Sequence, residues 1–201
     1  MRAFLDDLAS EASTPGGGSA AGVIGAMGAA LVSMVCRLTI GRKGYEAVDA
    51  ELRAVLDEAE AWRARLSDMV RADVEAYDAV LAAYRLPKDT AEQAVARTDA
   101  VQAALHGATE VPMACARGSA AVVGLARRAA EKGNRTAAGD AGAGALAALA
   151  ALRASALNVH ANAARMTDRV YASAALAELE VLLADAALRV EELWQLLTAR
   201  A

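Results

Sequence analysis

A single carboxylate, Asp73, lies where a helix of this pattern would normally carry an apolar side chain. It falls on a stripe of apolar residues at helical spacing that includes Val70, Tyr77 and Val80. Because a buried carboxylate is costly unless it is paired, Asp73 needs either a structural partner or a chemical role. The structural alternatives are a buried ion pair and a polar contact at a helix crossing. The functional alternative is a general acid or base that moves protons in a reaction.

Two asparagines, Asn158 and Asn162, lie four residues apart inside a predicted helix, although Asn is a poor helix former. They share a polar stripe with Ser155 and Arg165. One alternative is a face exposed to solvent. A face built for water normally carries Glu, Lys and Arg, so the short amides favour directed hydrogen bonds to a ligand or across an interface.

Two further charged residues stand next to predicted helix ends. Asp140 lies just before or at the start of a helix from about Ala141, and a role as N-cap would by itself explain it. Lys43 and Arg42 form a small basic corner after an earlier helix, where a solvated loop charge near a helix C-terminus is the simpler explanation. The functional alternative for this corner is a seat for the carboxylate of a substrate.

A glycine run, Gly16-Gly17-Gly18, precedes Ser19 and is predicted to be a loop, because each glycine inside a helix costs about 1 kcal/mol relative to Ala. Ser19 is then the predicted N-cap of a helix built mostly of small, uncharged residues. The loop is either a tight turn or a site where free N–H groups attract an anion. It lacks the Lys-Ser/Thr pair of a P-loop and follows a helix, which excludes nucleotide binding by that route.

The composition restricts the class of protein. A chain of 201 residues suggests one domain, taken here as residues 1–201, and the net charge of −4 gives no electrostatic case for nucleic acid. Hydrophobic residues make up 56% and aromatic residues 3%, which is typical of closely packed helices. Cys36 and Cys115 have no metal-ligand spacing, and His106 and His160 have no catalytic partner, so no metal site is expected.

The first residues, including Asp6 and Asp7, are too acidic for a signal peptide, so a cytoplasmic location is expected. Residues 16–36 carry no charge and are long enough to span a bilayer, which leaves a membrane span as an alternative. This segment is rich in Ala and Gly, poor in Leu, Ile and Phe, and has no flanking aromatic belt. A buried central helix is therefore favoured, with no membrane partner.

The hydrophobic periodicity predicts an all-α fold, an up-and-down bundle of five to six long helices. Asp89 or Thr90 is the expected N-cap of the fourth helix, and Pro112 is expected to kink that helix. Because helices of about 40 residues are long for this chain, the bundle is expected to dimerise through helix faces. The predicted helices cover residues 3–12, 19–40, 45–85, 90–132, 141–165 and 168–199.

Several short motifs occur in one order along nearly the whole chain. The principal ones are Phe4-Leu5-Asp6-Asp7-Leu8-Ala9, Thr14-Pro15-Gly16-Gly17-Gly18-Ser19, Gly41-Arg42-Lys43, Asp73-Val74-Glu75-Ala76-Tyr77-Asp78, Arg85-Leu86-Pro87-Lys88, Asp140-Ala141-Gly142 and Ala156-Leu157-Asn158-Val159-His160-Ala161-Asn162. In this order they resemble the cyclodeaminase/cyclohydrolase family of folate enzymes. That family includes stand-alone bacterial methenyltetrahydrofolate cyclohydrolases and the cyclodeaminase part of formiminotransferase-cyclodeaminase, and this chain resembles the stand-alone members more.

The resemblance implies an all-α homodimer with folate bound at or near the subunit interface. It also implies that Asp73 is the catalytic acid or base. The family's remaining motif positions become expected substrate-binding residues, namely Gly16, Gly17, Gly18, Ser19, Lys43, Asp140, Asn158 and Asn162. A tetrahydrofolate derivative is the expected substrate, with no tightly bound cofactor and no metal.

The reaction that this resemblance favours is hydrolysis of 5,10-methenyltetrahydrofolate to 10-formyltetrahydrofolate by acid/base catalysis. The carbon that water attacks is already electrophilic, so one positioned carboxylate can serve both proton transfers. Two alternatives stay open. One is formimidoyltetrahydrofolate cyclodeaminase, a lyase that releases ammonia, and the other is a helical protein that binds folate without turning it over.

Overall fold

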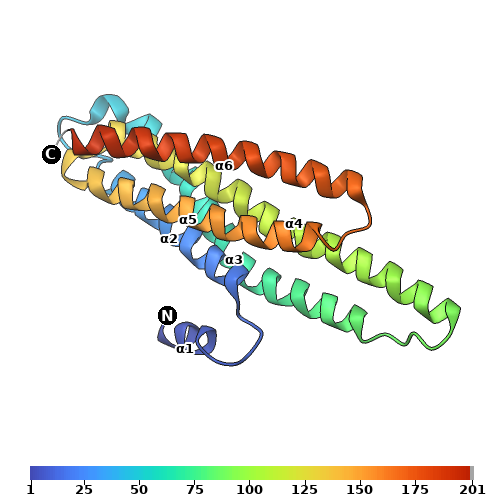
Figure 1. Cartoon of the computed structure of the whole chain (residues 1–201). Coiled ribbons are helices and arrows are strands. Elements are labelled where there is room, and N and C mark those ends of the chain that lie inside the picture. The colour runs from blue at the N-terminus through green and yellow to red at the C-terminus, as the bar shows by residue number, and fades with distance from the viewer. Residues whose placement is uncertain (200–201) are drawn as a thin grey trace.

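The computed structural model describes residues 1–199, which form six α-helices joined by turns and two short 3-10 helices (Figure 1). No β-strand occurs among residues 1–199, so the predicted all-α class is confirmed. The α-helices are α1 (Arg2–Leu8), α2 (Gly17–Arg37), α3 (Asp49–Tyr84), α4 (Ala91–Lys132), α5 (Ala138–Ala163) and α6 (Arg169–Thr198). The 3-10 helices are η1 (Glu46–Val48) and η2 (Arg135–Ala137).

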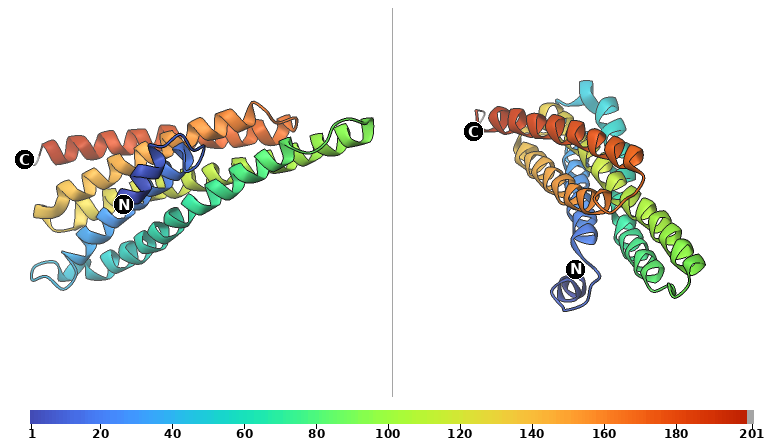
Figure 2. Two further views of the ribbon diagram at one scale, coloured as in Figure 1. Left: turned by 90° about the horizontal axis from the view of Figure 1, so that it is seen from below. Right: turned by 45° about the vertical axis from the view of Figure 1, so that its right-hand side comes forward.

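The uncharged helix α2 lies in the middle of the bundle. It packs against α3 and α5 and also contacts α4, while α6 packs on α4 and α5. Figure 2 shows α1 standing apart from the bundle, and none of its residues is buried. The turn between α3 and α4 extends well beyond the ends of α2 and α5 (Figures 1 and 2). The long α3–α4 pair therefore forms one wall along the central helix.

Glycines allow α2 to approach its neighbours at backbone distance. A Cβ atom added at Gly22 would lie 2.9 Å from the carbonyl oxygen of Leu66 on α3. A Cβ at Gly28 would lie 2.8 Å from the carbonyl oxygen of Gly144 on α5. The smooth face of α2 is thus occupied by two neighbouring helices.

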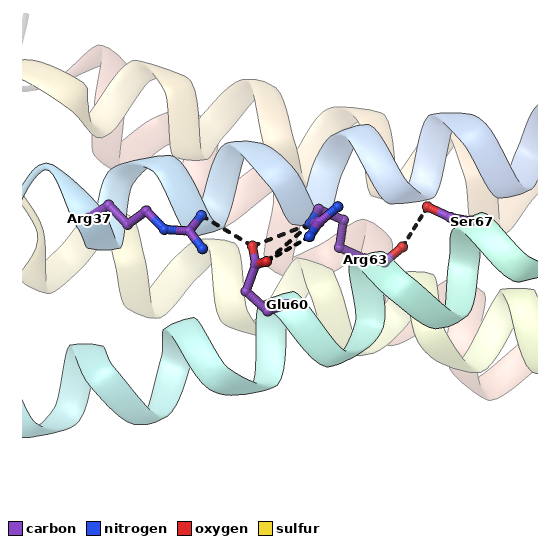
Figure 3. Close-up of polar contacts among 4 residues, drawn as sticks. All are labelled: Arg37, Glu60, Arg63 and Ser67. Atoms are coloured by element: carbon purple, nitrogen blue, oxygen red, sulfur yellow. Dashed lines mark hydrogen bonds and ion pairs between the residues drawn. The ribbon is translucent and has the colours of Figure 1, made fainter.

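A polar cluster joins α2 to α3 near the C-terminal half of α2 (Figure 3). The Glu60 carboxylate accepts hydrogen bonds from Arg63 at 2.7 Å and from Arg37 of α2 at 3.2 Å. The hydrogen bond from Arg63, more than any other contact, lowers the pKa of Glu60 to about 2. Ion pairs this exposed contribute little to stability, because solvent screens both charges.

The structure corrects several expected helix boundaries. The second helix begins at Gly17 rather than at Ser19, its N-cap is Gly16, and Ser19 lies buried within the first turn. The predicted role of Ser19 as N-cap is therefore wrong. The segment predicted as one helix from residue 45 begins with η1 before α3, and the fifth α-helix begins at Ala138 rather than at Ala141.

The start and middle of α4 follow simple rules. Thr90 is its N-cap, and a capping box forms in which Thr90 Oγ1 accepts from the Gln93 N–H at 3.2 Å. Of the two residues expected to cap this helix, Thr90 is confirmed. The helix continues without a break through Pro112, although proline removes one backbone hydrogen bond from the ladder.

Two helical segments, Gly17–Arg37 and Arg135–Ala163, are long and apolar enough to cross a membrane by length and composition. About half of each apolar window is buried inside the bundle, 56% and 50% respectively. The core helix of a soluble protein passes the same test, so packing within the bundle accounts for these segments. The cytoplasmic location stays a prediction.

The glycine contacts give a test of the packing. We expect Gly28→Ala to lower the free energy of unfolding by about 1–3 kcal/mol, because the new Cβ meets the Gly144 carbonyl and overpacks the crossing. The matched control is Gly124→Ala in α4, where no atom lies within 4 Å of the added Cβ. That change should stabilise the protein by about 0.5–1 kcal/mol through helix propensity. Urea denaturation measures both, and equal effects of the two substitutions would contradict the packing argument.

Candidate active site

One pocket brings together residues of α3, α4 and α5 beside the N-terminus of α2. Its volume is about 220 Å³, and it opens to solvent on one side. It contains three of the polar residues predicted as site residues from the sequence, Asp73, Asn158 and Asn162. The lining consists of Asp73, Ala76, Tyr77 and Val80 of α3, Ala108 and Pro112 of α4, Asn158, Ala161 and Asn162 of α5, and Arg165 just beyond α5.

The carboxylate of Asp73 lies against the first turn of α2. Its Oδ2 atom accepts a hydrogen bond from the buried Ser19 hydroxyl at 2.8 Å. A Cβ at Gly18 would overlap Oδ1 of Asp73, so this close approach requires glycine at that position. The glycine run therefore makes room for the catalytic candidate, an arrangement that the motif alone did not reveal.

The N-terminus of α2 adds a favourable electrostatic environment for this carboxylate. The first helical hydrogen bond runs from the Ala20 N–H to the Gly16 carbonyl at 2.9 Å, so the N–H groups of Gly17, Gly18 and Ser19 have no acceptor within the helix. The positive end of the helix dipole favours a negative charge at this position. The free N–H groups and the dipole of α2 at the glycine run thus favour the charge of Asp73, while binding of a substrate anion by this run stays a prediction.

Of the alternatives for Asp73, an ion pair is not found among residues 1–199, whereas a polar contact at the α2–α3 crossing is present through Ser19. Asp73 also faces the pocket and is half-buried, so the polar contact and a chemical role coexist. Cys115 lies nearby but is buried, and burial raises the pKa of its thiol. This environment favours the neutral thiol and disfavours a nucleophilic role for Cys115.

The two asparagines use their amide nitrogens to bind backbone carbonyls. Asn162 Nδ2 donates to the carbonyl oxygen of Ala108 on α4 at 2.7 Å, and Asn158 Nδ2 donates to the carbonyl oxygen of Ala154 at 3.2 Å. Both side chains are half-buried and line the pocket. These two residues are therefore only partly exposed to solvent, and Asn162 makes a directed hydrogen bond to another helix.

Lys43 and Asp140 lie at the opposite end of the bundle. The two helices α2 and α5 run antiparallel, so the C-terminal end of α2 meets the start of α5. There the Thr39 hydroxyl accepts from the Asn134 N–H at 2.8 Å. Asp140 precedes Asn158 by 18 residues of one helix, or about 27 Å along its axis. Within one chain, Lys43 and Asp140 are therefore remote from Asp73, and their substrate-binding roles stay predictions.

Asp140 itself is not an N-cap. The N-cap of α5 is Ala137, and Asp140 lies in the first turn of the helix, where its charge is favourable with the helix dipole. The structural alternative proposed for this residue is therefore wrong in its detail, because η2 moves the start of α5 three residues earlier than the sequence suggested.

Seven of the ten lining residues were not predicted as site residues from the sequence, and Pro112 and Arg165 are two of them. Pro112 was seen only as a source of a kink, and Arg165 only as part of a polar stripe. Arg165 supplies a cation at the rim, in a turn whose backbone is held by Gln102: the Arg165 carbonyl accepts from Gln102 Nε2 at 3.2 Å, and the Thr167 N–H donates to Gln102 Oε1 at 2.7 Å. Among residues 1–199, no group of three or more His, Cys, Asp or Glu side chains is placed to hold a metal ion.

The protein is an all-α antiparallel bundle. One carboxylate, two asparagines and a helix N-terminus meet at a single pocket. Residues 1–181 match the family model described as formiminotransferase-cyclodeaminase. The chain is 52% identical over 195 residues to methenyltetrahydrofolate cyclohydrolase of Methylorubrum extorquens, covering 97% of this chain and 94% of that protein. It therefore belongs to the formiminotransferase-cyclodeaminase family, and the resemblance noted in its motifs is confirmed.

Two further relatives place the chain within that family. It is 34% identical over 171 residues to formimidoyltransferase-cyclodeaminase of Rattus norvegicus, which is 85% of this chain and 32% of the longer rat protein. The crystal structure of formiminotetrahydrofolate cyclodeaminase from Thermotoga maritima matches with a TM-score of 0.83 and 30% identity, over 96% of this chain and 94% of that one. The chain thus shares its fold with a structure named as a cyclodeaminase.

Proposed function

We propose that this protein hydrolyses 5,10-methenyltetrahydrofolate to 10-formyltetrahydrofolate, with Asp73 as the acid/base group. The observation that carries the proposal is an accessible carboxylate, held at a helix N-terminus in a pocket that it shares with two asparagines. It is supported by the 52% identity to a protein named methenyltetrahydrofolate cyclohydrolase over nearly the whole chain.

The reaction requires proton transfers at one carbon. Water attacks the methenyl carbon, which is bonded to N5 and N10 and carries the positive charge of the amidinium. Asp73 takes one proton from that water, and a tetrahedral carbinolamine forms. The bond from carbon to N5 then breaks, N5 receives the proton from Asp73, and the hydroxyl loses its proton as the formyl group forms on N10. One carboxylate thus returns to its starting state, and one proton is released.

Ser19 positions the carboxylate for both transfers. Its hydroxyl donates to Asp73 Oδ2 at 2.8 Å and lies 3.4 Å from the Val70 carbonyl oxygen. While Asp73 is ionised, the Ser19 proton points to the carboxylate. When Asp73 is protonated, Ser19 can accept from it and donate to Val70 instead. The contact therefore suits either protonation state of Asp73, and the substrate-binding role expected for Ser19 becomes a positioning role.

We also infer that the working form is a homodimer. The pocket of about 220 Å³ is smaller than the roughly 300–1,000 Å³ typical of ligand sites, so it suits the pterin end of a folate better than the whole molecule. A second copy packed antiparallel on α2 would bring its Lys43 end towards this pocket. An apolar stripe on the outer face of α2 offers the contact, through Val23, Met27, Ala30, Met34 and Leu38.

The alternative reaction is that of a formimidoyltetrahydrofolate cyclodeaminase. It is supported by the similarity to the Thermotoga maritima structure named formiminotetrahydrofolate cyclodeaminase. In that reaction N10 attacks the formimino carbon and ammonia leaves, so the same carboxylate would move the protons. A folate-binding protein without turnover is the remaining alternative.

The assay that tests the proposal follows the near-ultraviolet absorbance of 5,10-methenyltetrahydrofolate, which its product lacks. We expect wild-type protein to accelerate its loss and Asp73→Asn to reduce kcat by roughly 10²–10⁴-fold, because the acid/base group is removed. A variant with wild-type turnover would contradict the assignment. If the wild type is inactive but forms this absorbance and ammonia from formimidoyltetrahydrofolate, the cyclodeaminase alternative holds. Inactivity in both assays would favour the alternative of a protein that binds folate without turning it over.

Removal of the Ser19 hydroxyl tests the positioning role. We expect Ser19→Ala to lower kcat about 10-fold or more with little change in KM, because a hydrogen bond to a charged group is worth about 1.5–3 kcal/mol. Ser33→Ala is the matched control, since Ser33 is equally buried on α2 but does not contact Asp73. A raised KM with unchanged kcat would instead indicate that Ser19 binds substrate.

Glutamate substitutions on the proposed interface of α2 test the dimer. The double variant Met27→Glu and Met34→Glu should be monomeric in light scattering and should bind folate more weakly, because the partner's contribution is lost. Val181→Glu is the control, since Val181 is equally apolar and 68% exposed but lies on α6. A wild-type protein that is monomeric at assay concentration would contradict the inference.

A further inference from the structure

Pro112 leaves a backbone carbonyl without its helical partner at the wall of the pocket. In α4 the carbonyl oxygen of Ala108 would normally accept from the N–H of residue 112, and proline has no N–H. The proline is buried and lines the same pocket as Ala108. An acceptor in such a position needs a donor from elsewhere, because an unpaired carbonyl in a half-buried place is unfavourable.

Asn162 of α5 supplies that donor. Its Nδ2 atom lies 2.7 Å from the Ala108 oxygen. Because the bonded partner is a carbonyl, the amide group facing it must be the NH₂ group, and this fixes the orientation of the side chain. The Oδ1 atom of Asn162 is therefore not used by this contact, while the residue itself lines the pocket.

Asn158, one turn earlier in α5, also donates its amide nitrogen to a backbone carbonyl, in this case one of its own helix. Its Nδ2 atom donates to the carbonyl oxygen of Ala154, four residues before it in the same helix, at 3.2 Å. No donor to Oδ1 of either asparagine is found among residues 1–199. Two amide oxygens, about one helical turn apart on residues that line the pocket, are thus left free to accept hydrogen bonds.

We propose that Asn162, oriented by the carbonyl that Pro112 leaves free, and Asn158 form an acceptor pair that recognises a donor edge of the ligand. This inference rests on the proposed function, in which the ligand is a tetrahydrofolate. The pterin ring carries such an edge, where the ring N3–H and the 2-amino group both donate. With this edge on the asparagines, the opposite end of the ring, which carries N5, is directed towards Asp73.

The pair acts on specificity, and its role differs from that of Asp73. The asparagines bind the part of the ring that does not react, so their contribution is to ligand affinity and to discrimination between donor and acceptor edges. Pro112 does not need to touch the ligand in this account. It is a positioning residue that acts through the Ala108 carbonyl and Asn162.

The test measures binding, so that it does not depend on turnover. Titration calorimetry gives the dissociation constants of 5-formyltetrahydrofolate and of its 2-desamino analogue, which lacks one donor of the recognised edge. Wild-type protein should prefer the parent compound by about 10-fold or more. Asn162→Ala should bind the parent about 10-fold more weakly and should discriminate less between the two compounds.

Pro112→Ala restores an N–H that competes for the Ala108 carbonyl and so loosens the orientation of Asn162. We expect it to lower the preference for the parent compound several-fold without lowering the unfolding temperature, a combination that a purely structural role would not produce. Pro87→Ala, in the exposed turn before α4, is the control and should change neither quantity.

Equal binding of the two compounds by wild-type protein, or full preference retained in Asn162→Ala, would overturn the proposal. Tight, discriminating binding by a protein that shows no turnover would leave the acceptor pair supported and the cyclohydrolase function rejected. Turnover by the wild-type protein without discrimination between the two compounds would support the cyclohydrolase function and reject the acceptor pair.

Discussion

The contact between the Asp73 carboxylate and the first turn of α2 is the constraint on which the site depends. Gly18 must lack a side chain for the carboxylate to reach the helix, and the buried Ser19 hydroxyl then bonds it at 2.8 Å. Gly22 continues the close approach along α3. The position of the acid/base candidate is thus set by helix–helix packing in the middle of the bundle, where displacement is costly, and not by a loop.

The other walls of the pocket follow from the same antiparallel arrangement. Because α5 runs against α2, its last turns meet the first turn of α2, and Asn158 and Asn162 come to face Asp73 across a small cavity. The same geometry carries Asp140 and Lys43 to the far end. A folate longer than this cavity would extend beyond it, and in the proposed homodimer the Lys43 end of the second copy lies towards that part of the ligand.

Much of the fold was predictable because apolar periodicity, glycine stretches and capping residues are local signals. Thr90 as a cap and the central, uncharged helix are examples. The errors arose where tertiary contacts override local rules. Serine is a common N-cap residue, yet the hydroxyl of Ser19 donates a hydrogen bond to Asp73 of another helix. The sequence predicts that Pro112 kinks α4. Its effect on Asn162 depends instead on the hydrogen bond between Asn162 and Ala108, which are 54 positions apart. Such pairings are not encoded in spacing along one helix.

The most direct test of the central claim is a crystal structure of the protein with bound tetrahydrofolate, whose N5–H can donate a hydrogen bond to a carboxylate. We predict that the pterin lies in the pocket of Asp73, with N5 within about 3 Å of its carboxylate, the distance of a hydrogen bond, and with Ser19 still bonded to that carboxylate. A pterin bound at the Lys43 end of its own chain, or an Asp73 turned away from the ligand, would contradict the account.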